Sequence, residues 1–132
     1  MFSPFSPKEL YTLSKNLCED SEEFCSDSCN LECIHRTAIN RSYYASFLHA
    51  REWLRKKSIP IVYYKRDSKK RSEHRQVIDY LKKEGKTTVS GKLLALKHYR
   101  KKADYDIGPN DSIKDFDAKD SVGLAKEIIN SL

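Results

Sequence analysis

The chain is predicted to fold as an all-α protein, an antiparallel up-and-down bundle of four main helices and a shorter one. Its 132 residues include only four glycines and four prolines, so few positions interrupt a helix. Apolar residues recur at spacings of three and four along most of the chain. No repeat of about 20–50 residues and no heptad register is present, which excludes solenoids and coiled coils. The length fits one domain over residues 1–132.

The first predicted helix begins at Ser6, after a segment at residues 1–5 that is expected to be irregular. Ser6 suits the capping position, Pro7 suits the first helical position, and Glu9 completes a capping-box pattern. The predicted apolar face of this helix consists of Leu10, Leu13 and Leu17. The acidic stretch 19–30 that follows has no helical spacing of apolar residues and is expected to be irregular.

The clearest periodicity spans residues 31–57 and predicts a long helix that is central to the fold. It ends in three consecutive cations, which complement the dipole at a helix C-terminus. Residues 58–64 contain Pro60 and are expected to form an irregular packed loop, with a short edge strand as the alternative. The basic run 65–71 is expected to be exposed. The apolar stripe of the long helix is Ile39, Tyr43, Phe47, Ala50 and Leu54.

Three further helices are predicted in the rest of the chain. The first covers residues 72–84 and stops at Gly85, the second covers residues 89–104, and the third begins near Asp117. Their predicted inward positions are, in order, His74, Val77, Ile78 and Leu81; then Leu93, Leu96, Arg100 and Ala103; then Val122, Ala125, Ile129 and Leu132.

The net charge of +6 is distributed unevenly along the chain. Residues 1–33 carry a net charge of −5, residues 34–102 carry +15, and residues 103–132 carry −4. A basic middle between acidic ends predicts either a polyanionic partner such as nucleic acid or charge pairing inside the fold.

Four cysteines lie near the start of the chain, at Cys18, Cys25, Cys29 and Cys33. Their spacing matches no zinc finger or zinc ribbon. The cysteines are interpreted as reduced, packed thiols, and no structural disulfide is expected. A metal site that includes His35, or a redox sensor, is the alternative. We therefore predict no metal and no cofactor.

Two arginines interrupt apolar helical faces. Arg100 lies in register with leucines, and Arg41 lies close to the register of two alanines. A buried arginine requires a partner, because an unpaired charge in a protein interior is strongly unfavourable. These arginines therefore predict an ion pair with Asp104 or Asp106, a subunit interface, or a polar cleft.

Several common functional signals are absent from the sequence. It contains no G-x-S-x-G, H-E-x-x-H, P-loop or G-x-G-x-x-G motif, which excludes the enzyme classes that depend on them. No apolar run approaches the ~20 residues that span a bilayer. The first residues lack the features of a secretory signal. We expect a cytoplasmic protein that is not bound to a membrane.

Three blocks of the sequence resemble HEPN domains, the "higher eukaryotes and prokaryotes nucleotide-binding" family. The blocks are RTAINRSYYASFLHAREWL at 36–54, SEHRQVIDYL at 72–81 and LLALKHYRKKADYDIG at 93–108. They occur in the order that the family shows. The resemblance implies an antiparallel helical bundle that dimerises through the helix carrying a conserved arginine.

Many members of this family are metal-independent ribonucleases of toxin–antitoxin, CRISPR-associated and other defence systems. They use an R-x4–6-H motif, in which the arginine stabilises charge on the phosphate and the histidine transfers protons. Arg100 matches that arginine, but residues 104–107 contain no histidine, and Tyr105 is the nearest match. A phenol is a poor base at neutral pH. Other family members are non-catalytic nucleotide binders or partners of a minimal nucleotidyltransferase.

The missing histidine favours a protein that binds RNA or nucleotide phosphate in an arginine-lined cleft at a homodimer interface. Its partner would be a nucleotidyltransferase antitoxin. The first alternative is a metal-independent ribonuclease that uses Arg100 with Tyr105 or a histidine from elsewhere, and the second is a structural interaction protein. The candidate catalytic residues are Arg100, Tyr105 and Asp104, and the candidate binding residues are Arg41, Tyr43, His74, Lys101 and Lys102.

Overall fold

The computed structural model describes residues 5–25, 30–63 and 72–132. Within these residues, all regular secondary structure is helical. The predicted all-α class is therefore confirmed. The basic run 65–71 lies outside the described residues. The helices of the described part are α1 (Pro7–Glu19), α2 (Ser21–Phe24), α3 (Leu31–Lys56), α4 (Glu73–Lys83), α5 (Thr87–Tyr105) and α6 (Asp115–Ser131).

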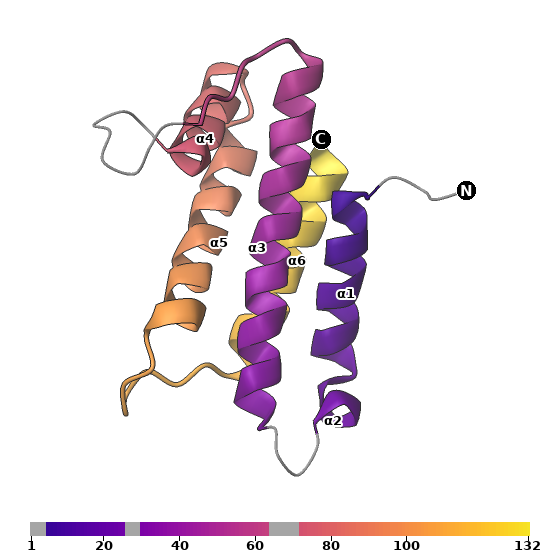
Figure 1. Ribbon diagram of the computed structural model, residues 1–132, viewed down its shortest axis with the longest axis vertical. Helices are drawn as coiled ribbons and strands as arrows, with labels where there is room; N and C mark the ends of the chain where they lie inside the picture. Colours follow the sequence, from indigo (N-terminus) through magenta and orange to yellow (C-terminus); the bar gives the residue numbers. More distant parts are fainter. Residues whose placement is uncertain (1–4, 26–29, 64–71) are drawn as a thin grey trace.

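Four long helices, α1, α3, α5 and α6, lie side by side, and each runs opposite to the long helix before it (Figure 1). The longest helix, α3, packs against the other three. The short helix α4 lies beside the upper end of α5 and packs on both α3 and α5 (Figure 1). Side chains of α3, α4 and α5 therefore meet in one part of the bundle.

The ends of the helices follow the local chemistry of the sequence. The side chains of Ser6, Asn30 and Ser72 accept hydrogen bonds from backbone amides in the first turns of α1, α3 and α4. Gly85 follows the end of α4 with a φ of +79°, a left-handed conformation that glycine adopts without a steric cost. The predicted stop at this glycine is confirmed.

Some predicted boundaries are wrong by a few residues. The acidic stretch 19–30 contains the single-turn helix α2, because an acidic first turn favours a helix N-terminus. Helix α5 begins at Thr87, two residues before the predicted start, and α6 begins at Asp115. The segment that contains Pro60 is irregular over its described residues, as predicted.

The predicted inward face of α1 is wrong in one position. Leu13 is 44% exposed, and Ser14 is completely buried in its place. The hydroxyl of Ser14 donates a hydrogen bond to the carbonyl of Ala38 at 2.9 Å and also pairs with the hydroxyl of Ser42. Small residues on α3 allow α1 to approach closely here, and a serine that finds hydrogen-bond partners is accommodated without an unpaired polar group.

The apolar core forms two groups of buried side chains. The larger group surrounds the meeting point of α3, α4 and α5, and the smaller group lies nearer the other end of the bundle. Fully buried members of the larger group include Tyr43, Leu54, Val77, Leu81, Leu93 and Leu96.

Within the described ranges, no helix combines the length and apolar character that a membrane span requires.

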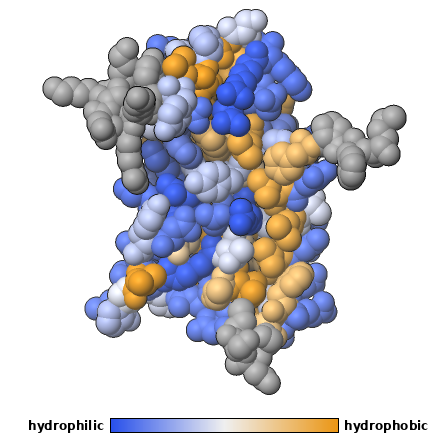
Figure 2. Space-filling model, viewed as in Figure 1, coloured by the Kyte–Doolittle hydropathy of each residue, from blue (hydrophilic) through white to orange (hydrophobic). Residues whose placement is uncertain are grey.

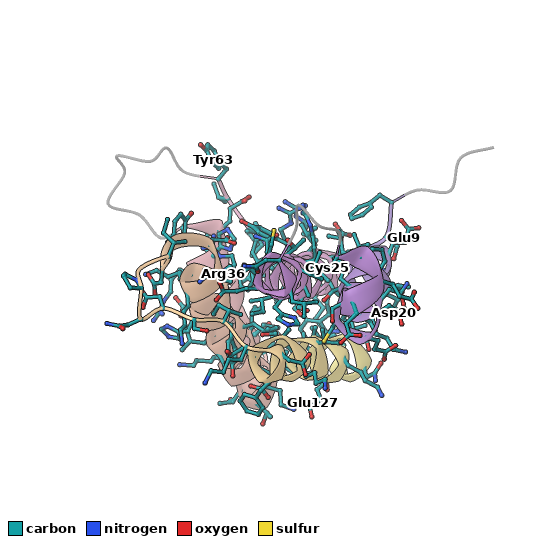
Figure 3. All side chains as sticks on the ribbon, turned by 90° about the horizontal axis from the view of Figure 1, so that it is seen from below. Glu9, Asp20, Cys25, Arg36, Tyr63 and Glu127 are labelled. Carbon is teal, nitrogen blue, oxygen red and sulfur yellow. The ribbon has the colours of Figure 1, made fainter. Side chains whose placement is uncertain are left out.

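The C-terminal end of α5 is held in place by Arg36 of α3 (Figure 3). The two terminal nitrogens of Arg36 donate hydrogen bonds to the backbone carbonyls of Lys102, Ala103, Asp106 and Asp111, at 2.7–3.2 Å. The carbonyls at a helix C-terminus lack intrahelical partners, and a cation there also complements the helix dipole. Arg36 thereby fixes the last turn of α5 and the loop that follows it against α3.

Replacing this arginine by alanine is expected to lower the free energy of unfolding by about 2–4 kcal/mol, because several carbonyls lose a charged donor. Urea denaturation of Arg36→Ala measures the effect. Arg55→Ala is the control, since Arg55 is 43% exposed and its pairing distance to Glu52 is 3.8 Å. That variant should lose less than about 0.5 kcal/mol. Equal losses in the two variants would contradict the anchoring role of Arg36.

Candidate functional site

Arg100 lies on the inward line of α5, between the buried residues Leu96 and Ala103, as predicted. Its side chain is only 14% exposed. The guanidinium carbon lies 5.4 Å from the ring centroid of Tyr43, 5.9 Å from that of Tyr44 and 5.8 Å from that of Tyr105. Aromatic faces attract a cation at such distances, so these rings offset part of the cost of removing the guanidinium from water.

Asp104 supplies the opposite charge one turn along the same helix. Its carboxylate lies 3.6 Å from Nη1 of Arg100, which confirms the predicted ion pair. The side-chain amide of Asn40 donates to both oxygens of this carboxylate, at 3.3 and 3.1 Å. Asp106 does not provide the ion pair for Arg100, and its backbone carbonyl accepts from Arg36 instead. Among the described residues, the buried Nε of Arg100 has no hydrogen-bond acceptor.

His74 reaches this site from α4. Its imidazole stacks on Phe47 with ring centroids 4.3 Å apart, and its Nδ1 lies 2.5 Å from the hydroxyl of Tyr43. Tyr43 is completely buried, and burial raises the pKa of its hydroxyl, so the phenol stays protonated. Tyr43, predicted to contact RNA, therefore has no exposed surface in this structure, and its hydroxyl pairs with His74. We call Tyr43, Tyr44, His74, Arg100, Asp104 and Tyr105 the Arg100 cluster.

Cations outnumber carboxylates around the Arg100 cluster. Burial lowers the pKa of His74, and the charges of Arg100 and Lys97 lower it further. Burial also lowers the pKa of Lys97, as do the neighbouring Arg75, Arg100 and Lys101. These shifts share one physical cause, which is that an additional proton is unfavourable among cations in a partly desolvated site. The charged residues gathered here are five cations, Arg51, Arg75, Lys97, Arg100 and Lys101, and three carboxylates, Glu73, Asp79 and Asp104.

Arg41 does not face inward, contrary to the prediction. Each residue turns an α-helix by about 100°, which places Arg41 about 60° from Ala38 and about 40° from Ala45 around α3. Both alanines are completely buried, whereas Arg41 lies beyond the edge of the buried stripe and is exposed.

Arg41 instead lines an open groove of about 840 Å³ beside the Arg100 cluster, between α3 and the end of α5. Asp104 lies on the boundary of the two and belongs to both. Hydrophilic side chains dominate this side of the molecule, and hydrophobic ones gather over α1 and its junction with α3 (Figure 2). The residues that line the groove, which we call the α3–α5 groove, are Asn30, Glu32, Cys33, Arg36, Thr37, Asn40, Arg41 and Asp104.

The remaining predicted site residues are all accessible. Tyr105 is 67% exposed, although one face of its ring lies near the guanidinium of Arg100. Lys101 and Lys102 are exposed in the last turns of α5. The Arg100 cluster thus combines a buried floor, formed by Tyr43, with an accessible rim.

The region also contains four residues that are not among the predicted site residues, namely Arg36, Asn40, Arg75 and Lys97. A signal existed for Lys97, because it precedes Arg100 by three residues and therefore lies on the same face of the helix. No comparable signal marks Arg36, since its partners are backbone carbonyls far along the chain.

The cysteines do not assemble into a site in the described part of the chain. Cys18 is buried, and burial and the nearby Asp115 raise the pKa of its thiol, as is typical of a packed, unreactive cysteine. Cys33 is exposed, and Cys29 lies outside the described residues. Among the described residues, no group of three or more histidines, cysteines and carboxylates is arranged to hold a metal ion.

No protein-family model, curated protein or solved structure matches this chain.

The pKa of His74 is expected to lie below the usual ~6.5 of histidine and to rise in Arg100→Met, which removes a neighbouring positive charge. A proton NMR titration of the imidazole measures both values. Because folding lowers this pKa, the neutral ring stabilises the fold above pH ~6.5. This stability is lost as the pH falls through the folded-state pKa. A titration midpoint that Arg100→Met leaves unchanged would contradict this electrostatic coupling.

Proposed function

We propose that the Arg100 cluster and the α3–α5 groove bind the phosphate groups of RNA or of a nucleotide. The observation that carries this proposal is the excess of cations around a partly paired arginine. Five cations face three carboxylates there, and the neighbouring cations add to the effect of burial in lowering the pKa values of His74 and Lys97. A bound phosphate would offset the repulsion among these cations.

The rim of the site suits a base next to the phosphate. Tyr105 presents a largely exposed ring beside Arg100, and unpaired bases commonly stack on tyrosine rings and on arginine planes. Lys101 and Lys102 provide exposed charges on the same helix for neighbouring phosphates. The arrangement favours a single-stranded segment, whose bases are available for stacking.

We further propose that the protein is a HEPN-like domain that works as a homodimer with a nucleotidyltransferase partner. The three blocks that carry the resemblance contribute Tyr43 and Tyr44, His74, and Arg100 with Asp104 and Tyr105, so they converge on one site. The α3–α5 groove is open on one side, and a second copy would enclose a ligand more completely.

Metal-independent RNA cleavage is a second candidate function, and the position of His74 is the observation that favours it. The resemblance lacks a histidine after Arg100, but α4 supplies one that is linked to the same tyrosine as Arg100. This would provide the pairing of arginine and histidine that the ribonucleases of the family use.

RNA binding should depend on Arg100. Fluorescence anisotropy with a labelled single-stranded RNA, in EDTA and at low salt, is expected to show about tenfold or more loss of affinity in Arg100→Met, since a charged hydrogen bond to phosphate is removed. Lys101→Ala and Lys102→Ala should each reduce the slope of log affinity against log salt by about 1.

Lys126→Ala is the matched control, because it removes the same charge from an exposed position on α6. Circular dichroism establishes that each variant remains folded. Equal losses of RNA affinity in Arg100→Met and Lys126→Ala would show that RNA is attracted only by the net charge of the protein. An absence of binding by both RNA and nucleotide at low salt would overturn this proposal and favour the alternative of a structural interaction protein.

The homodimer is tested separately by analytical ultracentrifugation at micromolar concentration. We expect a mass of twice that of the chain, and we expect Arg41→Glu to shift the equilibrium toward monomer, since it places an acidic group at the edge of the shared groove. A monomer over the whole concentration range would contradict a cleft shared by two copies.

A further inference from the structure

The hydroxyl of Tyr43 determines which nitrogen of His74 carries the proton. Tyr43 is completely buried, and in the part of the chain that the structure describes its hydroxyl pairs with His74 Nδ1 alone. If Nδ1 carried the proton, it would donate to the phenol oxygen, and the phenol O–H would be buried without an acceptor. A buried donor without an acceptor is costly, so the phenol donates and Nδ1 accepts.

A neutral imidazole that accepts at Nδ1 carries its proton on Nε2. The ring is held in this orientation by its stacking on Phe47, with an angle of 18° between the planes, and by a similar alignment with Tyr43. The second nitrogen of His74 is therefore a fixed hydrogen-bond donor. Protonation of Nδ1 would break this arrangement, because Nδ1 could then no longer accept from the phenol.

We infer that Tyr43 positions His74 as a hydrogen-bond donor, so that Arg100 and His74 together hold a phosphodiester of single-stranded RNA without cleaving it. This inference rests on the proposed function and decides between its two forms. Both side chains contact Tyr43, since the guanidinium carbon of Arg100 lies 5.4 Å from the ring centroid and His74 binds the hydroxyl. Two donors on one rigid support suit the oxygens of a phosphate.

Cleavage would require a base, and His74 is not free to act as one. In metal-independent cleavage, a base takes the proton of the 2′-hydroxyl while its oxygen bonds to phosphorus and the 5′-oxygen leaves with a proton. His74 cannot take that proton at Nε2, because this nitrogen already carries one. The carboxylate of Asp104 accepts hydrogen bonds from Asn40 and pairs with Arg100, and that of Glu73 lies 3.7 Å from Arg51, so both carboxylates already have partners within this chain.

The tautomer is tested first, by nitrogen-15 NMR of the imidazole in the full-length protein without RNA. We expect an unprotonated Nδ1 and a protonated Nε2 at pH 7.5, and we expect Tyr43→Phe to move the Nδ1 resonance because its hydrogen bond is lost. A protonated Nδ1 in the wild-type protein would overturn the inference, whatever the protein binds.

Binding is tested next, with a labelled single-stranded RNA in EDTA. His74→Ala should weaken binding by about tenfold, whereas His74→Gln should stay within about threefold of wild type, since its amide N–H replaces the Nε2 donor. The exposed His98→Ala is the control and should bind as wild type does. Gel analysis should recover the RNA intact from every mixture.

The possible failures can be told apart. An absence of RNA binding by the wild-type protein would overturn the proposed function together with this inference. Binding that His74→Ala leaves unchanged would overturn the inference alone. RNA cleavage that His74→Gln abolishes would also overturn it, since a base cannot be replaced by an amide.

Discussion

The structure depends on the compensation of one guanidinium that is mostly withdrawn from water. An arginine in this position would destabilise a helical bundle unless its charge met suitable partners. Arg100 has the faces of three tyrosines and the carboxylate of Asp104. This compensation fixes the register of α5 against α3, since Tyr43 and Tyr44 come from α3 and Asn40 of the same helix holds Asp104.

Arg36 and Arg100 are both half-buried, but they have different roles. Arg36 donates from both terminal nitrogens to four backbone carbonyls, so its hydrogen-bonding capacity is used within the fold. Arg100 has one carboxylate at 3.6 Å and a buried Nε without an acceptor in the described residues. An arginine of the first kind stabilises a helix end, whereas one of the second kind retains capacity for a phosphate.

The sequence predicts the helices well because each has a strong local signal, such as the stop at Gly85 or the apolar spacing of α3. It also identifies Arg100 and its pairing with Asp104, since both lie on one helix. It fails for Arg41, where a rotation of about 40–60° around the helix separates a buried position from an exposed one. It cannot find Arg36 or the bond between Tyr43 and His74, because these join segments that are distant in the chain.

If Arg100 and His74 form one phosphate-binding site, a single bound phosphate must affect both side chains. An NMR titration of the isotopically labelled protein with an RNA dinucleotide measures this. We expect the Nε–H signal of Arg100 and the Nε2–H signal of His74 to shift together, with the same dissociation constant, while signals of α6 stay in place. Shifts that leave both side chains unchanged, or that occur at only one of them, would contradict a shared site.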